Sequence, residues 1–295
     1  MGFMDHVAAC NDHDARRFIP FTIRGRMVGR MRPDFAELLK PWPELFSVTR
    51  HGVALKCTDA GLAACSARVS GVLEQLIAQG ELGPFHGECY AAVAEDGAEG
   101  GKEPLLLIDR AMAPCFGIRA YGQHVNGIVR SREGLKMWVS RRADDRQHYP
   151  GRLDNLAAGG LPYGLTLSEN LAKECWEEAG IPEPLVRTAV SVGAVSYHMD
   201  TEKGFKSDIL YCYDLELPED FVPSCMDGEV QEFYLWPLEQ VMELVRDSRE
   251  FKLNCNLVII DFLIRHGYLG PDDASYLGLL SALRPGLPPL DPVCG

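Results

Sequence analysis

The 295-residue sequence lacks a run of about 18 apolar residues, the length that a membrane-spanning helix needs. Its first ten residues, MGFMDHVAAC, have neither the basic region nor the apolar stretch of a signal peptide. His6 stands where a myristoylation signal needs Ser or Thr. We therefore expect a cytoplasmic protein without a membrane partner.

Basic residues are also scarce, with 29 Lys and Arg against 42 Asp and Glu and a net charge of −13. Because nucleic-acid binding needs clustered positive charge, this balance argues against a nucleic-acid partner. The ten cysteines contain no C-x-x-C pair, which removes the usual sequence sign of a zinc or redox site. Cys175 and Cys212 lie in apolar patterns and are predicted to be reduced core thiols.

The composition is that of a globular protein, with 46% hydrophobic and 24% charged residues. A chain of this length normally divides into two domains. We predict a small α+β domain over residues 1–112, a larger α+β domain over 113–285, and an irregular Pro-rich tail over 286–295. The first domain shows no catalytic constellation.

Hydrophobic periodicity gives the elements of both domains. In the first, we predict helices at 33–40 and 59–79, a strand or hairpin at 46–56, and strands at 88–94 and 105–109. In the second, strands are predicted at 121–130, 135–142, 188–197, 205–217 and 231–238. Helices are predicted at 167–179, 238–247 and 255–266.

The helix at 167–179 has clear ends, because Thr166 and Glu169 fit a capping box and Gly180 and Pro182 stop it. At about 100° per residue, one set of side chains forms the predicted buried stripe: Leu171, Ala172, Cys175, Trp176 and Ala179. Glu174 and Glu177 lie just off its edge, and Glu178 lies inside it. The buried stripe therefore borders three carboxylates.

These acids stand at the carboxyl end of the helix, where the macrodipole disfavours them and where they repel one another. A bound divalent cation such as Mg²⁺ would remove both costs. Gly160 and Gly164 before the helix permit a close backbone approach that a side chain would block. Glycine-rich loop, capped helix and acidic cluster together predict a metal site.

The stretch AGGLPYGLTLSENLAKECWEEAGI, residues 158–181, resembles the Nudix box. Gly159 takes the first glycine position, Lys173-Glu174 the Arg-Glu position, Cys175 the apolar position, Glu177-Glu178 the Glu pair, and Gly180-Ile181 the end. Two positions depart from the pattern. Leu165 stands where the box has an early Glu, and Lys173 replaces Arg, which removes a bidentate fork.

The resemblance implies the Nudix α/β/α sandwich fold and Mg²⁺-dependent hydrolysis of a diphosphate linkage, with Mn²⁺ as an alternative ion. It implies metal binding by Glu174, Glu177 and Glu178, and catalytic roles for Glu177, Glu174 and Lys173. A further acid from a later loop is expected, with Glu229 the first candidate and Glu232 the next. The substrate-binding candidates are Gly159, Gly160, Arg152, Tyr197 and His198, with Tyr163, Phe205 and Trp42 as further aromatic side chains.

Nearly the whole chain is similar to a subfamily that includes plant Nudix hydrolases and the Nudix half of fungal proteins fused to thiamine pyrophosphokinase. This implies a small-molecule substrate, thiamine diphosphate or its oxidised analogues, and allows a homodimer. Tyr197 keeps nucleoside diphosphate derivatives and dinucleoside polyphosphates open as substrates. A Nudix isomerase would need a Cys that the stretch DNLAAGG lacks, and a ligand-binding sensor without turnover is the other alternative.

Overall fold

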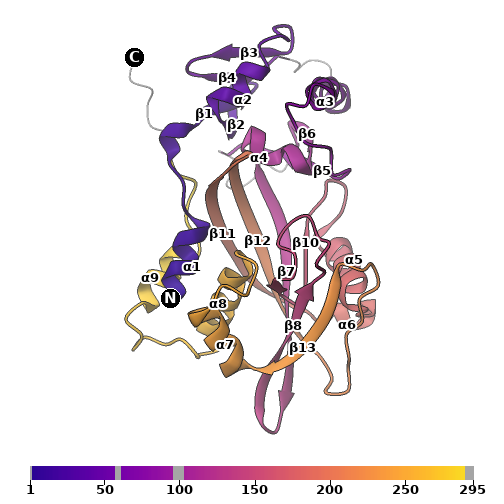
Figure 1. The fold of residues 1–295 in the computed structure, drawn as a ribbon, viewed down its shortest axis with the longest axis vertical. Helices are drawn as coiled ribbons and strands as arrows, with labels where there is room; N and C mark the ends of the chain where they lie inside the picture. The colour runs from indigo at the N-terminus through magenta and orange to yellow at the C-terminus, as the bar shows by residue number, and fades with distance from the viewer. Residues whose placement is uncertain (1, 57–60, 96–102, 290–295) are drawn as a thin grey trace.

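The structure is a computed structural model that describes residues 2–56, 61–95 and 103–289. Two parts lie one above the other in Figure 1, a small α+β part and a larger part built on a seven-stranded sheet. Within these ranges, no helix combines the length and the apolar character needed to cross a membrane.

The small part has a four-stranded sheet in the order β2-β1-β4-β3 and a separate β5-β6 pair. Its strands are β1 (Ile19–Ile23), β2 (Arg26–Met31), β3 (Phe46–Thr49), β4 (Gly52–Leu55), β5 (Cys89–Ala92) and β6 (Leu106–Asp109). Its helices are α2 (Pro33–Leu38), α3 (Leu62–Ala78) and α4 (Ala113–Phe116). The apolar side of α3 packs into one core with the strands, as its period predicts.

The large part has a sheet in the order β11-β12-β7-β8-β13, with β10 paired to β7 and β9 paired to β8. Its strands are β7 (Arg119–Ser131), β8 (Gly134–Arg142), β9 (Leu153–Asp154), β10 (Ala157–Gly160), β11 (Val190–Thr201), β12 (Gly204–Glu216) and β13 (Val230–Pro237). β12 and β7 are parallel, and the other pairs are antiparallel. The sheet is therefore mixed.

Helices cover both faces of this sheet. Helices α5 (Leu167–Ala179) and α6 (Glu183–Val186) cover one face, and α1 (Phe3–Cys10), α7 (Leu238–Asp247), α8 (Cys255–Arg265) and α9 (Tyr276–Ala282) lie on the other. In β7, Val125 and Val129 enter the core beneath α5, whereas Ile128 enters the core beneath α8. This alternation is the period of a strand buried on both faces. The fold is the predicted α/β/α sandwich with a small α+β part.

The hydrophobic cores of the small and the large part do not divide the chain at residue 112. Phe3, Val7 and Cys10 of α1 lie in the core of the large part with α8 and α9, although they open the chain. Figure 1 places α1 beside these helices, away from the rest of the small part. Phe116 and Ile118 instead complete the core of the small part. Each part therefore takes in residues from the other side of that position.

A tight contact joins α4 to β2. Gly117 ends α4 with a φ of 59°, and a Cβ on Gly117 would lie 1.9 Å from the carbonyl oxygen of Arg30. No rearrangement of a flexible side chain can relieve this contact, because the obstacle is backbone. Only glycine fits at this position.

We predict that Gly117→Ala lowers the free energy of unfolding by at least about 2 kcal/mol, since left-handed backbone and a backbone clash act together. Urea unfolding followed by circular dichroism measures this loss. The matched control is Gly71→Ala inside α3, where a Cβ meets nothing within 4 Å. That change should stabilise the protein by about 0.5–1 kcal/mol. Equal effects of the two changes would contradict the prediction.

Candidate active site

Helix α5 begins and ends where the sequence predicts. The backbone N–H of Thr166 donates to the Glu169 carboxylate at 2.9 Å, and the N–H of Glu169 donates to the Thr166 hydroxyl at 3.2 Å. Gly180 ends the helix in the left-handed region, with a φ of 63°. These caps fix the rotation of the helix, and therefore the direction of its carboxylates.

The buried side of α5 is turned further toward the acids than predicted. Leu171, Cys175 and Ala179 are buried as expected, but Trp176 is 50% exposed, so its place in the predicted stripe is wrong. Asn170 takes up the burial instead, with 0% exposure. Its side-chain amide donates to Gln123 of β7 at 2.9 Å and to the carbonyl of Gly160 at 3.0 Å. A buried polar contact therefore sets the face that α5 presents to the sheet.

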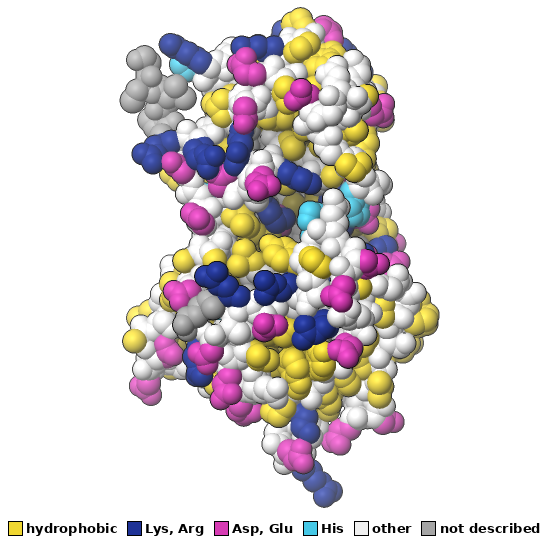
Figure 2. All heavy atoms as spheres, viewed as in Figure 1, with side chains coloured by type: hydrophobic (Ala, Val, Ile, Leu, Met, Phe, Trp, Pro, Cys, Tyr) yellow, Lys and Arg dark blue, Asp and Glu magenta, His cyan; other side chains and the backbone are white. Residues whose placement is uncertain are grey.

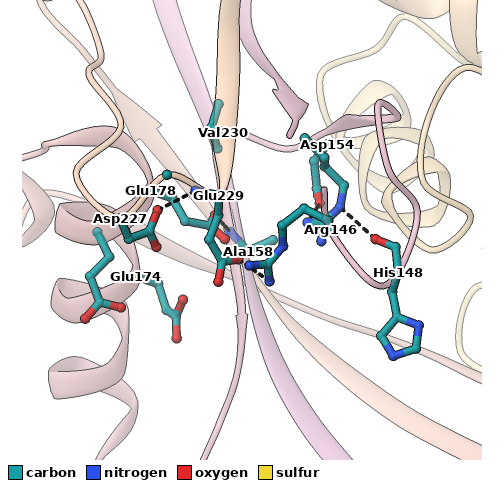
Figure 3. A network of polar contacts seen from close by, with 12 residues as sticks. Arg146, His148, Asp154, Ala158, Glu174, Glu178, Asp227, Glu229 and Val230 are labelled. Carbon is teal, nitrogen blue, oxygen red and sulfur yellow. Dashed lines mark hydrogen bonds and ion pairs between the residues drawn. The ribbon is translucent and has the colours of Figure 1, made fainter. Parts of the chain in front are cut away.

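Strand β10 brings its backbone against the acids of α5. A Cβ on Gly159 would lie 2.1 Å from the carboxyl carbon of Glu174, so only glycine leaves room for that side chain. The N–H of Ala158 donates to Glu178 at 2.8 Å, a contact drawn in Figure 3. The close approach to α5 therefore occurs at Gly159, whereas the predicted approach at Gly164 is wrong, because a Cβ there would meet nothing within 4 Å.

Lys173 links two of the acids. Its Nζ lies 2.9 Å from Glu177 and 3.2 Å from Glu174. Burial opposes the positive charge, but the hydrogen bonds to Glu177 and Glu174 raise the pKa of Lys173. Burial raises the pKa of Glu174, and Lys173 offsets only part of that rise. Lys173 therefore holds the position expected of the Arg in the box, without a two-pronged contact to one carboxylate.

Glu178 is a carboxylate with little compensation. It is 6% exposed, and burial followed by the charges of Asp154 and Glu174 raises its pKa well above the usual value. The Ala158 N–H and Lys252 act in the other direction but do not outweigh burial. Lys173 joins Glu174 to Glu177, and the charge of Glu174 acts on Glu178, but among the described residues these three carboxylates do not form a group with ligand oxygens within 4.8 Å of one another. Carboxylate oxygens are the ligand type that Mg²⁺ or Mn²⁺ takes, so the residues present fit such an ion by their chemistry.

Glu229 comes from the loop before β13, opposite α5. Its carboxylate pairs with Arg146 at 2.6 Å, and its carbonyl accepts the N–H of Ala143 at 2.9 Å. In Figure 3 its side chain points toward the segment where Glu178 meets Ala158. Glu232 instead accepts a hydrogen bond from the Tyr234 hydroxyl on the exposed side of β13. Glu229 is therefore the better placed of the two later acids.

Comparison with known proteins agrees with this geometry. A family model described as "NUDIX domain" matches residues 120–255, and one described as "Domain of unknown function (DUF4743)" matches residues 2–120. Nudix hydrolase 20, chloroplastic, of Arabidopsis thaliana is 40% identical over 296 residues, which cover 96% of this chain and 78% of that protein. Nudix hydrolase 24, chloroplastic, of the same plant is 41% identical over 291 residues, 97% of this chain and 78% of that protein.

The chain belongs to the Nudix hydrolase family. A protein of Saccharomyces cerevisiae is also similar, with 39% identity over 202 residues that cover 63% of this chain and 59% of that protein. The similarity to the plant proteins extends over both parts of the structure, so the small part is shared with them and is not an appendage of this chain alone.

Several predicted substrate-binding residues lie away from the Nudix carboxylates. Tyr197 belongs to the core beneath α8, on the other face of the sheet from α5, and its hydroxyl donates to Asp208 at 2.6 Å. His198 contacts Ser207 and stacks on Phe205. Tyr197 and His198 are each 2% exposed and offer no ring face to a ligand in this structure. Arg152 donates to the carbonyl of Arg249 on the surface.

The remaining aromatic candidates divide in the same way. Phe205 is fully buried, and Trp42 packs against the core of the small part. Tyr163 is 49% exposed and lies in the loop between β10 and α5, where its N–H donates to the carbonyl of Cys89. Of these three, Tyr163 is next to the Nudix helix. The structure therefore brings together Gly159, Gly160, Lys173, Glu174, Glu177 and Glu178.

A second polar group lies beneath α8. Ligand atoms of His124, Asp154 and Cys255 lie within 4.8 Å of one another, a spacing that could hold a metal ion. Asp154 is already paired with Arg142 and Lys252, each at 3.0 Å. The Cys255 thiol donates to Asp154 at 2.7 Å, and burial raises the thiol pKa well above its usual value. A protonated thiol beside a neutralised carboxylate is a poor cation site, so this group is a structural network.

Sequence reasoning missed two residues of the small part that lie beside the Nudix loop. A Cβ on Gly160 would lie 2.0 Å from the Tyr90 hydroxyl and 3.3 Å from the Arg110 guanidinium carbon. Neither residue stands in a recognisable motif, and both are about 50 positions or more before the loop. Only the docking of the two parts brings them there.

We predict that Gly159→Ala lowers the rate of diphosphate hydrolysis by on the order of 10²-fold, because the new methyl group displaces the Glu174 carboxylate. The fold should survive, since the obstacle is the end of a flexible side chain. Steady-state kinetics with thermal unfolding measures both effects. Gly71→Ala in α3 is again the control for an added methyl group, because a Cβ there meets nothing within 4 Å and the backbone is helical. Retention of full activity by Gly159→Ala would contradict this placement of Glu174.

A second prediction concerns Glu178. Because its pKa is raised in the folded protein, its contribution to stability is present below its usual pKa of 4.5 and is lost as the pH rises through the folded value. Without divalent cations, Glu178→Gln should therefore raise the melting temperature relative to wild type, by an amount that grows with pH. Thermal melts in EDTA from pH 5 to pH 8 measure this difference. Mg²⁺ should raise the melting temperature of wild type more than that of the variant.

Proposed function

We propose that this Nudix protein is a Mg²⁺-dependent hydrolase that cleaves the diphosphate linkage of thiamine diphosphate or of its oxidised analogues to the monophosphate and phosphate. The observation that carries the proposal is the close packing of α5 on β10, which sets Glu174 against Gly159 and Glu178 on the Ala158 N–H, while Lys173 joins Glu174 to Glu177. These carboxylates favour a divalent cation and, with it, a diphosphate.

The chain's own residues divide the work. Glu174, Glu177 and Glu178 would hold the ion, which neutralises phosphate charge and lowers the pKa of a bound water. Glu177 is the most open of the three, with a side-chain exposure of 39%, and is the proposed acceptor of the water proton. Lys173 would keep Glu174 and Glu177 apart and aligned. Glu229, held by Arg146, is the alternative proton acceptor.

Positive charge near the site favours a phosphorylated substrate. Burial lowers the pKa of His148, and the charges of Lys203, Lys206, Arg110 and Arg142 lower it further. Arg110 comes from the small part, and Lys203, Lys206 and Arg142 come from one end of the large sheet. An anion that entered this region would be attracted from several sides.

The choice of thiamine derivatives depends on the resemblance, seen in the sequence, to Nudix domains that accompany thiamine pyrophosphokinase. The similarity to the plant relatives covers 96–97% of this chain, which supports a substrate-binding site formed by both parts. Tyr197 is the residue that kept nucleotide substrates open, and its burial beneath α8 leaves it without access to a nucleotide. Nucleotide substrates therefore serve as the comparison in the test.

We predict that Glu177→Gln lowers turnover by about 10²–10⁴-fold, as loss of a general base does, while the melting temperature changes little. Phosphate release with saturating Mg²⁺ measures the effect. The matched control is Glu183→Gln in α6, because Glu183 likewise pairs with a cation four residues away on an exposed helix face. Unchanged turnover in Glu177→Gln would exclude Glu177 as the proton acceptor.

The substrate itself is tested by a screen with Mg²⁺ and with EDTA. The compounds are thiamine diphosphate, oxothiamine diphosphate, oxythiamine diphosphate, ADP-ribose and diadenosine tetraphosphate. We expect Mg²⁺-dependent phosphate release to be fastest with a thiamine derivative. Faster cleavage of a nucleotide would move the substrate to that class, and no turnover of any compound would favour a ligand-binding sensor.

A further inference from the structure

The β5-β6 hairpin of the small part lies against the Nudix loop. The N–H of Tyr163 donates to the carbonyl of Cys89 in β5 at 2.7 Å. The missing side chain of Gly160 leaves space for Tyr90 and Arg110, as the Cβ distances of 2.0 and 3.3 Å show. The end of strand β10 is therefore in contact with Glu174 at Gly159 and with the small part at Gly160.

Arg110 is presented by a rigid turn. Asp109, the last residue of β6, accepts the N–H groups of His86, Gly87 and Ala111 at 2.9, 2.8 and 2.8 Å. The N–H of Arg110 itself donates to the carbonyl of Glu88 at 2.8 Å. Four hydrogen bonds thus fix the backbone around Arg110 before any ligand arrives, which reduces the ordering cost of binding.

The guanidinium of Arg110 has one carboxylate partner and remains accessible. It pairs with Glu88 at 2.8 Å, and its side chain is 38% exposed. It lies over the Tyr90 ring, 5.9 Å from the ring centre. Burial opposes the charge, but Tyr90, Glu88 and the Nudix carboxylate Glu174 raise the pKa of Arg110. Arg110 therefore stays positively charged and interacts electrostatically with Glu174, one of the proposed metal ligands.

Other cations continue this positive region. Arg110, Lys203, Lys206 and Arg142 act together on His148 from the small part, the β11-β12 turn and the end of β8. Figure 2 shows Lys and Arg side chains interspersed with Asp and Glu side chains where the molecule narrows between its two parts. Three of these cations already pair with a carboxylate, Arg110 with Glu88, Arg142 with Asp154 and Lys206 with Asp208, so a phosphoryl group would bind there by competing with these acids.

We propose that Arg110 of the small part is a substrate-binding residue of the Nudix site and holds a phosphoryl group of the diphosphate next to the carboxylate cluster. The inference rests on the proposed function and assigns one role to the domain of unknown function. A planar guanidinium suits two oxygens of one phosphoryl group. In the free protein, the Glu88 carboxylate already accepts a hydrogen bond from the Arg110 guanidinium, and a phosphoryl group would compete with this carboxylate.

This role differs from that of a structural ion pair in one measurable way. If Arg110 and Glu88 only join strands, removal of either partner weakens the same contact, and both changes act in the same direction. If Arg110 binds phosphate, Arg110→Gln weakens anion binding, whereas Glu88→Gln removes a competing carboxylate and strengthens it. Opposite signs therefore identify phosphate binding.

The test uses the full chain, Mg²⁺ and methylenediphosphonate, a diphosphate analogue without a cleavable oxygen bridge, in isothermal titration calorimetry. We expect Arg110→Gln to raise Kd by about 10- to 100-fold, the loss of a hydrogen bond to a charged group. Glu88→Gln should lower Kd several-fold. Arg130→Gln is the control, because Arg130 forms an exposed pair with Glu216 at the far end of β7 and should leave Kd unchanged.

The outcomes separate this inference from the proposed function. An Arg110-dependent Kd in a protein that hydrolyses no compound of the screen would remove the enzyme but keep the binding role. Hydrolysis with the same Kd in wild type and Arg110→Gln would overturn the role of Arg110 and keep the enzyme. A decrease in affinity in Glu88→Gln equal to that in Arg110→Gln, or no binding by wild type at millimolar probe, would also overturn it.

Discussion

The packing of α5 against β10 is the constraint on which the site depends. Acids at the end of a helix normally stay in water, because burial of a charge is costly. Here the absent side chain of Gly159 lets Glu174 approach the strand, and the Ala158 N–H donates a hydrogen bond to Glu178. Burial then raises the pKa of both carboxylates. The packing of α5 on β10 therefore buries two carboxylates, and a cation bound beside them would stabilise their charged forms.

The buried amides behind α5 maintain this arrangement. Asn170 joins α5 to Gln123 of β7 and to the carbonyl of Gly160, and Gln123 donates to the carbonyl of Leu167 at 2.9 Å. These bonds are made where water cannot replace them, so rotation of α5 would leave polar groups unsatisfied. They account for the exposure of Trp176, which the apolar pattern alone assigned to the core. Hydrogen bonding outweighed the burial of one large aromatic side chain.

The small part and the Nudix sandwich are joined by packing and by charge. A Cβ on Gly204 of β12 would lie 2.2 Å from the Pro114 carbonyl oxygen of α4, and the β5-β6 pair meets the loop between β10 and α5. Through these contacts, residues from the first third of the chain reach the site that the box defines. The shared similarity to the plant proteins over both parts is consistent with one functional unit.

The sequence alone determined features that depend on neighbours in the chain. The caps of α5, the acids near its end, the presence of a close glycine approach and the strand β7 follow from local spacing, so they could be predicted. Tertiary structure decided which acids were buried, and it moved Tyr197 and His198 away from the carboxylates. It also brought Arg110 and Tyr90 to Gly160. Contacts between distant segments depend on how two surfaces fit, and a residue pattern along one segment carries no record of the other surface.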